Sequence, residues 1–121
     1  MATVTPTTSG IALGDPNVQV IAWPLTTANT DGSPFSYVQY ADLCWQAAGT
    51  WGGATLTIQG SNDGTNWFSL SNAAAGTAAT FTADGGKQTI ERPLYVRPNL
   101  TTPGTGATVT VTLIARANIA R

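Results

Sequence analysis

The nine residues 107–115 read ATVTVTLIA, and the alternation of apolar residues with threonine over 107–113 decides the fold. In an extended chain successive side chains point to opposite faces, so the odd-numbered apolar residues share one face and the threonines share the other. The apolar face consists of Val109, Val111, Leu113 and Ala115. This pattern predicts a β-strand with one face in a core and a threonine-lined face toward solvent or a neighbouring molecule.

A second segment, ATLTIQG at residues 54–60, repeats the alternation with Leu56 and Ile58 inward and Thr55, Thr57 and Gln59 outward. Weaker strand candidates lie at residues 18–23, 35–40, 43–48, 66–70, 79–82, 87–91 and 94–99. We expect 43–48 to pair with 54–60 as a hairpin across the loop GTWGG. A two-turn helix at 42–48, with Asp42 as N-cap, is the alternative, but isolated helices of that length are marginal. The strand at 18–23 is expected to end before Pro24, which cannot donate to a ladder.

Eight or nine short strands separated by Asp-Gly and Gly-Gly turns indicate an all-β protein. We predict a single β-sandwich of jelly-roll or immunoglobulin-like topology over residues 17–121. Residues 1–16 are rich in Thr, Pro and Gly and are expected to form an extended N-terminal arm. In an assembly such an arm can reach a neighbouring subunit.

The chain has 121 residues, of which only 9% are charged, and its net charge is −1. Ordinary soluble domains carry about 25% charged residues. No basic field exists to attract nucleic acid or an anionic membrane, and few ions would lose water on contact with another protein. The N-terminus has no basic and apolar signal-like regions, and no apolar run approaches the ~20 residues of a membrane span. The lone Cys44 is interpreted as a small buried hydrophobe in a protein made in a reducing cytoplasm.

Reactive groups are scarce. The chain has no histidine, so it lacks the commonest general base and metal ligand. Four of its six carboxylates precede Pro or Gly, where Asp favours turns: Asp15, Asp31, Asp63 and Asp84. The segment SNDGTN at 61–66 offers oxygens that suggest calcium, but one carboxylate is too few, and a turn explains it better. We therefore predict no enzyme activity, no cofactor and no metal.

Four tryptophans allow two interpretations. They either form a sugar-stacking platform, or Trp45 and Trp67 are core and cross-strand residues of a small sandwich. Trp51 differs because it lies in a glycine-rich loop, and with Thr50 it is predicted to contact a partner. Arg97, which shares a strand face with Tyr95, is expected to pair with Glu91 or another acidic neighbour rather than with phosphate.

The stretch GTWGGATLTIQGSNDGTNWFSL at 49–70, followed by FTADGG, ERPLYVRP and the alternating strand, resembles small structural proteins of tailed bacteriophages. Proteins of that kind combine a GxxGGATxTxxGSNDGxxW block with a Tyr-Val/Ile-Arg-Pro strand. The resemblance covers residues 42–116. It implies a virion protein assembled in the host cytoplasm, most plausibly a capsid decoration or cement protein.

The resemblance further implies a homodimer or homotrimer that binds the major capsid protein, with no nucleic acid or membrane as partner. We predict the contact residues to be Thr50, Trp51, Arg97 and, from the arm, Pro6 and Thr7. A similar SxDGxxW turn occurs in discoidin-type domains, so a carbohydrate-binding module is the alternative. A tail, adaptor or head-fibre role also stays open.

Overall fold

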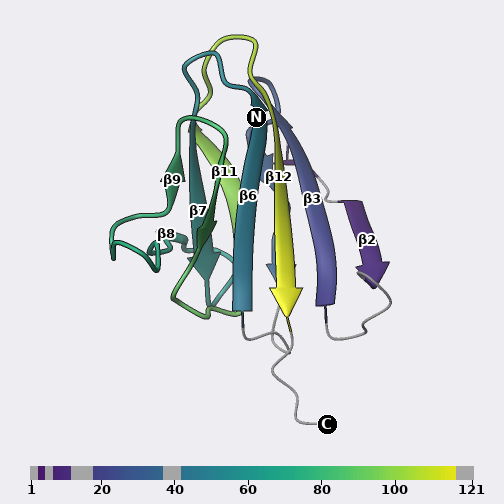
Figure 1. Ribbon diagram of the computed structural model, residues 1–121, viewed down its shortest axis with the longest axis vertical. Helices are drawn as coiled ribbons and strands as arrows, with labels where there is room; N and C mark the ends of the chain where they lie inside the picture. Colours follow the sequence, from purple (N-terminus) through teal and green to yellow (C-terminus); the bar gives the residue numbers. More distant parts are fainter. Residues whose placement is uncertain (1–2, 5–6, 12–17, 37–41, 117–121) are drawn as a thin grey trace, which may run out of the picture.

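The computed structural model describes residues 3–4, 7–11, 18–36 and 42–116. Within these ranges the chain is all-β, and its strands form two sheets that pack face to face (Figure 1). The sandwich predicted from the sequence is confirmed. Among the described residues no helix has the length and apolarity that crossing a membrane requires.

The five-stranded sheet is built around the segment that showed the strict alternation. Its central strand β12 (Thr108–Arg116) lies between β6 (Asp42–Thr50) and β3 (Val18–Thr26). The edges are β10 (Gly85–Gln88), beside β6, and β2 (Thr7–Ile11), beside β3. Every pairing in this sheet is antiparallel. The choice of a strand over a helix at residues 42–48 is thereby confirmed.

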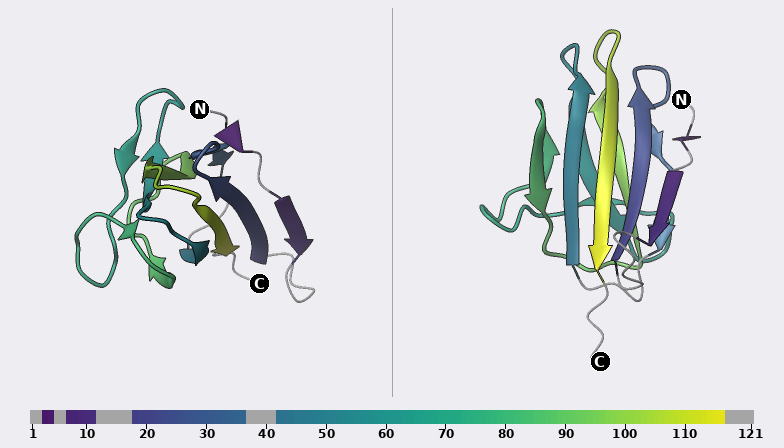
Figure 2. Two further views of the ribbon diagram at one scale, coloured as in Figure 1. Left: turned by 90° about the horizontal axis from the view of Figure 1, so that it is seen from above. Right: turned by 45° about the vertical axis from the view of Figure 1, so that its right-hand side comes forward.

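The seven-stranded sheet lies behind the first one (Figures 1 and 2). Its main path runs β1 (Thr3–Val4), β4 (Asp31–Gly32), β11 (Tyr95–Thr102), β7 (Thr55–Ser61) and β8 (Phe68–Ser69). Two further short strands attach to it, β5 (Phe35–Ser36) to β11 and β9 (Thr80–Phe81) to β7. Of the strand expected at 35–40, residues 37–40 lie outside the described ranges.

The hairpin expected between residues 43–48 and 54–60 is wrong. β6 pairs with β10 and β12, whereas β7 pairs with β11, β8 and β9, so the loop between β6 and β7 crosses from one sheet to the other. Gly52 and Gly53 have φ values of 55° and 83°, and the amide of Ala54 donates to the carbonyl of Trp51 at 2.9 Å. This tight turn resembles a hairpin turn locally but joins two layers.

Two smaller expectations also need correction. β3 does not end before Pro24 but continues to Thr26. Among the described residues, the pairing of β3 with β2 reaches Ala22, so on that side no described strand would accept a hydrogen bond from position 24, and a proline is tolerated there. Asp31 was expected in a turn, yet it begins β4 and pairs with Asn99.

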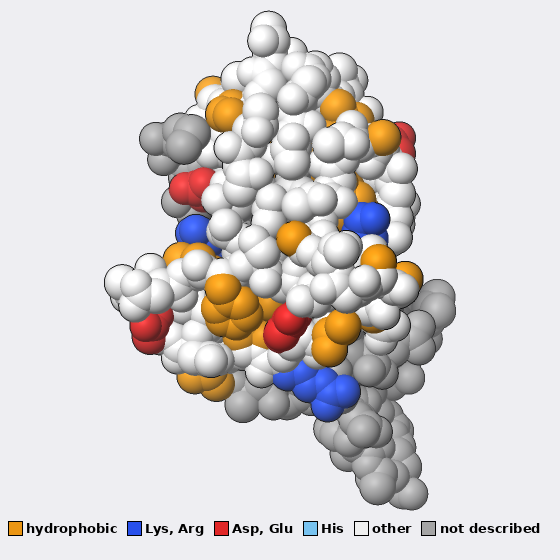
Figure 3. All heavy atoms as spheres, turned by 90° about the vertical axis from the view of Figure 1, so that its left-hand side faces the viewer, with side chains coloured by type: hydrophobic (Ala, Val, Ile, Leu, Met, Phe, Trp, Pro, Cys, Tyr) orange, Lys and Arg blue, Asp and Glu red, His pale blue; other side chains and the backbone are white. Residues whose placement is uncertain are grey.

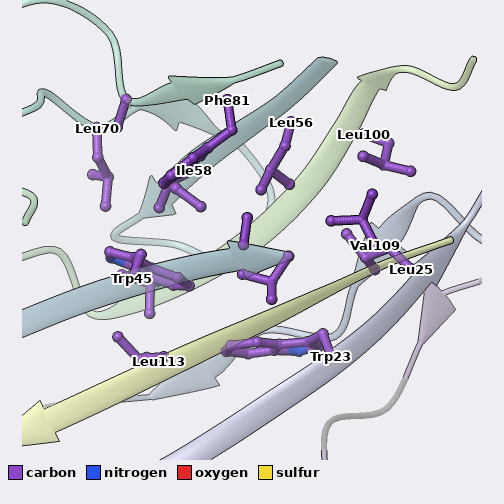
Figure 4. Packing of buried hydrophobic residues seen from close by; sticks show 14 of the residues in the cluster. Trp23, Leu25, Trp45, Leu56, Ile58, Leu70, Phe81, Leu100, Val109 and Leu113 are labelled. Atoms are coloured by element: carbon purple, nitrogen blue, oxygen red, sulfur yellow. The ribbon is translucent and has the colours of Figure 1, made fainter. Parts of the chain in front are cut away.

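The core lies between the sheets and is filled from both (Figure 4). Trp23 of β3 and Trp45 of β6 are fully buried, and their rings stack with centroids 5.8 Å apart at an interplanar angle of 22°. Trp45 donates its indole N–H to the buried Thr89 hydroxyl at 3.1 Å, and Trp23 donates to the Ser33 carbonyl at 3.0 Å. Both large rings are therefore buried without an unpaired donor.

The inward residues predicted for β12 and β7 are buried as expected. Thr57 was expected outward and does point away from the core, but it is only 6% exposed. Its hydroxyl lies 3.0 Å from that of Thr101 on β11.

The segment predicted as an N-terminal arm forms two edge strands where the structure describes it, one in each sheet. β1 pairs in parallel with β4, and β2 pairs with β3. The boundary proposed between arm and sandwich, at residues 16 and 17, falls outside the described ranges.

Candidate interaction surfaces

Uncharged side chains cover the middle of the outer face of the five-stranded sheet. We call this region the neutral face and define it by the even-numbered residues 20–26 of β3, 44–50 of β6, 86–88 of β10 and 108–114 of β12. None of these residues is Asp, Glu, Lys or Arg. On β6 all four are exposed, namely Cys44, Gln46, Ala48 and Thr50. The threonine-lined face predicted from the alternation of β12 is part of this surface.

Cys44 was interpreted as buried, and the structure contradicts that. Its side chain is exposed on the neutral face, opposite Ile114 and Gln88 on the neighbouring strands. Leu43 and Trp45, on either side of it, are buried. The period of two along β6 therefore forces Cys44 outward, and that signal was present in the sequence.

The outer face of the seven-stranded sheet has a different chemistry. Arg97 of β11 lies over the ring of Trp67, with its Cζ 4.1 Å from the ring centroid, and its Nε donates to the Gln59 side-chain oxygen at 3.0 Å. Asn99 donates to the same oxygen at 3.3 Å. Burial lowers the pKa of Arg97 from its ordinary value, while the nearby charge of Asp31 opposes that shift. The guanidinium is thus fixed by stacking and hydrogen bonding within the chain.

Of the two partners expected for Arg97, Glu91 is wrong, whereas an acidic neighbour is present as Asp31, whose charge acts on the guanidinium. Glu91 instead accepts the amide N–H and the hydroxyl of Ser71, each at 2.6 Å. Burial raises the pKa of Glu91, but these two bonds and the residue's own amide outweigh burial and leave the pKa below its ordinary value. This carboxylate therefore ties the segment after β8 to the segment before β11.

The Trp51 side chain is neither fully exposed nor without contacts to the rest of the chain. Its ring is half-buried and packs against the core, and its indole N–H donates to Asp84 Oδ1 at 2.8 Å. The same oxygen accepts the amide of Gly49 at 3.0 Å, and these two bonds lower the pKa of Asp84. A further bond runs from the amide of Thr105 to the carbonyl of Gly52 at 2.9 Å. Three loops, 49–54, 82–84 and 103–107, are thus joined at one end of the sandwich, which we call the loop end.

The segment SNDGTN at 61–66 forms a turn stabilised by its own side chains. Asp63 accepts the amides of Thr65 and Asn66, each at 2.8 Å, and the Asn66 side-chain amide at 2.8 Å. It also accepts the Ser61 hydroxyl at 2.9 Å, and these bonds hold the pKa of Asp63 far below its ordinary value. The carboxylate is occupied within the turn, as the turn interpretation predicts. Among the described residues no three His, Cys, Asp or Glu side chains gather as a metal ion would need.

An open hollow of about 540 Å³ lies beside the edge strand β10, lined by Asn72, Ala73, Ala74, Gly86, Lys87 and Gln88. Lys87, the only lysine of the chain, lies with its Nζ 5.1 Å from the centroid of the Phe81 ring. Glycine and alanine make up half of this lining, and its polar side chains are two amides and one amine. They do not form the acid–base pair that a hydrolytic site needs.

The predicted contact residues are dispersed over the molecule. Thr50 is exposed where the neutral face meets the loop end, Trp51 is half-buried at that end, and Arg97 lies on the opposite sheet. Pro6 lies outside the described residues, and Thr7 is described only as the first residue of β2. The structure therefore brings Thr50 and Trp51 together and separates them from Arg97. Asp84, which joins the loop end, was missed because its sequence context indicated only a turn.

Acidic and basic groups are scattered over the side of the molecule shown in Figure 3. Apolar side chains lie there in small groups between uncharged polar atoms, with only isolated acidic and basic groups. The large apolar residues that are exposed in the described chain are Phe68, Ile90 and Leu94. Protein surfaces of this composition lose little hydration energy on contact with other protein.

No protein-family model matches the sequence, and no curated protein is similar to it in sequence. The fold is similar to the crystal structure of the SPBc2 prophage-derived protein YomS, with a TM-score of 0.62 and 11% sequence identity over 81% of this chain and 93% of that chain. A second solved structure is from Bacillus endospore appendages, described as a novel family of disulfide-linked pili. It aligns with a TM-score of 0.38, 15% sequence identity and coverage of 94% of this chain and 89% of that chain. The chain therefore shares its sandwich fold with a prophage-derived protein.

Proposed function

We propose that this chain is a structural protein of a bacteriophage particle, and more narrowly a decoration or cement protein on the outside of the assembled head. In this role it bridges major capsid subunits and stabilises the shell. Its place is the virion, assembled in the host cytoplasm. A net charge of −1 favours other proteins over nucleic acid or an anionic membrane as partners.

The observation that carries this proposal is the distribution of charge. The described carboxylates Asp63, Asp84 and Glu91 are held by hydrogen bonds inside the chain, and the residues that define the neutral face include no charged one. This arrangement suits a protein that works by contact, because few ions lose water when such surfaces are covered. The fold shared with a prophage-derived protein supports the phage setting.

We assign the contact with the capsid to the loop end. Thr50, Thr105 and Gly106 are exposed there, while the bonds of Asp84 to Gly49 and Trp51 fix the loops before any partner binds. A surface that is already ordered loses little conformational entropy on binding. Trp51 then acts mainly by supporting the loops from within, and Thr50 and Thr105 make the contact.

Co-sedimentation with expanded empty capsids of the encoding phage tests the proposal. We expect the purified protein to bind at about 10 µM or below, the range of a specific interface. Thr105→Glu places a charge on the exposed loop end without removing the backbone bond of residue 105, and should weaken binding by at least about tenfold. Thr65→Glu, at the exposed turn after β7, is the matched control and should bind as wild type. Absence of wild-type binding at that concentration overturns the proposal.

The tryptophans give no support to carbohydrate binding. Trp23 and Trp45 are fully buried, Trp51 packs against the core, and Trp67 is half-buried beneath Arg97. A sugar-binding platform needs exposed ring faces on which a sugar can stack, and the described residues do not present a group of them.

A further inference from the structure

The neutral face is broad and nearly flat. Across the strands the register aligns Ala48 with Thr110 and Pro24 in one row, and Gln46 with Thr112 and Ala22 in the next. These side chains are small or unbranched, so they leave a surface with low relief. Two sheets with such faces can approach to about 10 Å, the spacing within a sandwich.

The area of the face fits a small interface. Seven residues each of β3, β6 and β12 span the neutral face, which gives about 23 Å by about 14 Å at ordinary strand rise and spacing, and β10 adds a short strip. That is about 400 Å² in projection, and side-chain relief adds to it. A standard interface buries about 800 Å² per partner, and the smallest specific ones about 600 Å². The neutral face is therefore at the small end of the sizes that a specific dimer uses.

We propose that the neutral face binds the neutral face of a second copy of this chain, as a two-fold dimer. In such a dimer the same patch lies on both sides of the contact. A charged patch would therefore face a like charge, whereas an uncharged patch meets no such repulsion. A typical protein surface, with about 25% charged residues, would bury ions against a face that has no counter-charge for them. A second copy presents an equally uncharged surface, and threonine hydroxyls can both donate and accept hydrogen bonds across the contact.

This inference rests on the proposed function only in treating the chain as a protein that assembles with other proteins. It places the two copies back to back across the five-stranded sheets. The neutral face and the loop end share Thr50, but the rest of the loop end lies beyond the ends of the strands, so in a dimer the loops that carry Thr105 and Gly106 stay accessible (Figure 2). One dimer could then hold two capsid subunits.

The reactivity of the Cys44 thiol can be used to measure this contact in the wild-type chain. It is the only cysteine of the chain and is exposed on the neutral face. We expect its reaction with a maleimide to slow by at least about tenfold per molecule between about 1 µM and about 300 µM freshly reduced protein, concentrations that span a micromolar dimer. Sedimentation equilibrium at the higher concentration should give twice the chain mass of 12.4 kDa. A chain that stays monomeric there overturns the inference, and so does a dimer whose Cys44 reacts as fast as before.

A pair of matched variants identifies the surface. Thr110→Lys puts a charge at the centre of the neutral face, and Thr80→Lys puts the same charge on exposed β9 of the other sheet. We expect Thr110→Lys to be monomeric with fully reactive Cys44 and an unchanged circular dichroism spectrum, and Thr80→Lys to dimerise as wild type. A dimer that survives Thr110→Lys overturns the inference, as does one broken by Thr80→Lys alone. If Thr110→Lys unfolds, Gln46→Lys on neighbouring exposed β6 takes its place.

The two proposals fail separately. A monomeric wild-type protein that still co-sediments with capsids overturns the dimer and leaves the proposed function standing. A dimer that binds no capsid overturns the proposed function and leaves the dimer.

Discussion

Trp45 and Thr89 form a hydrogen bond between two buried side chains. The indole N–H donates to the Thr89 hydroxyl at 3.1 Å, between a ring that is fully buried and a threonine that is 7% exposed. A buried donor that loses its acceptor keeps its full desolvation penalty. This bond therefore matters more to folding than its single-bond energy indicates.

Thr89→Val removes this acceptor and keeps nearly the same shape. We expect the free energy of unfolding to fall by about 1–3 kcal/mol, because the indole N–H stays buried without a partner. Urea midpoints of the variant and wild type measure the change. Thr80→Val, at an exposed strand position, is the control and should change stability by less than about 0.5 kcal/mol. Equal midpoints for Thr89→Val and wild type would show that the bond contributes nothing.

Acid should destabilise the protein through its hydrogen-bonded carboxylates. The pKa values of Asp63, Asp84 and Glu91 are all lowered in the folded state. A lowered folded-state pKa stabilises the protein above the ordinary pKa, and that contribution is lost as pH falls below it. Urea midpoints should therefore decrease from about pH 6 to about pH 2.5. Asp63→Asn should show a shallower decrease than wild type, and a wild-type midpoint that holds or rises in acid contradicts this account.

Single residues were predictable where the strand period was applied to them. Leu56, Ile58 and the odd-numbered apolar residues 109–115 of β12 point inward as the alternation requires. Cys44 was assigned by residue type instead of by period, and this is why its position was wrong. The partners of Trp51 and Arg97 could not be predicted, because Asp84 and Gln59 come from distant strands and loops that only the fold brings near.

At the scale of elements, the crossing between β6 and β7 explains the main failure of the sequence prediction. Inward residues of β6 and β7 point into the core whether the two strands pair in one sheet or face each other across the sandwich. The hydrophobic period therefore does not distinguish a hairpin from a crossing. The glycine turn also fits both, since its positive φ values are those of a hairpin turn.

Gly52 and Gly53 offer a direct test of how this crossing is built. Both have positive φ, but a Cβ on Gly52 would collide with the carbonyl oxygen of Thr105, whereas a Cβ on Gly53 meets nothing within 4 Å. We expect Gly53→Ala to lower the free energy of unfolding by about 1 kcal/mol and Gly52→Ala by about 3 kcal/mol. Denaturant midpoints of the two variants make the comparison. Equal losses would mean that the contact between loops 49–54 and 103–107 is not close in solution.

At the scale of the whole molecule, the sandwich follows from the number and spacing of short strands, which the sequence displays. The strand order does not follow, because pairing across a small sandwich is set by loops that carry no period. The edge strands β1 and β2 could not be predicted either, because they come from a segment without strict alternation and pair with different sheets. Its composition indicated an arm, and where the structure describes that arm it follows the sheet edges.

The functional proposals depend on this whole-molecule arrangement. The positions of the few charged residues become clear only in the folded chain. The residues that define the neutral face include no charged one, whereas the outer face of the other sheet holds Arg97 and Asp31. This asymmetry distinguishes the face that we assign to a second copy from the face with a fixed polar network. The loop end is then the surface that we assign to the contact with the capsid.

The central claim is that the chain stabilises an assembled shell by binding it. A ligand that binds the assembled lattice and not its separated subunits raises the lattice's melting temperature by mass action. Calorimetry of expanded empty capsids, with the protein absent, saturating, or replaced by Thr105→Glu, measures this directly. We predict a melting temperature several degrees higher with wild-type protein and little change with the variant. Capsids that melt at the same temperature with wild-type protein bound would contradict the claim.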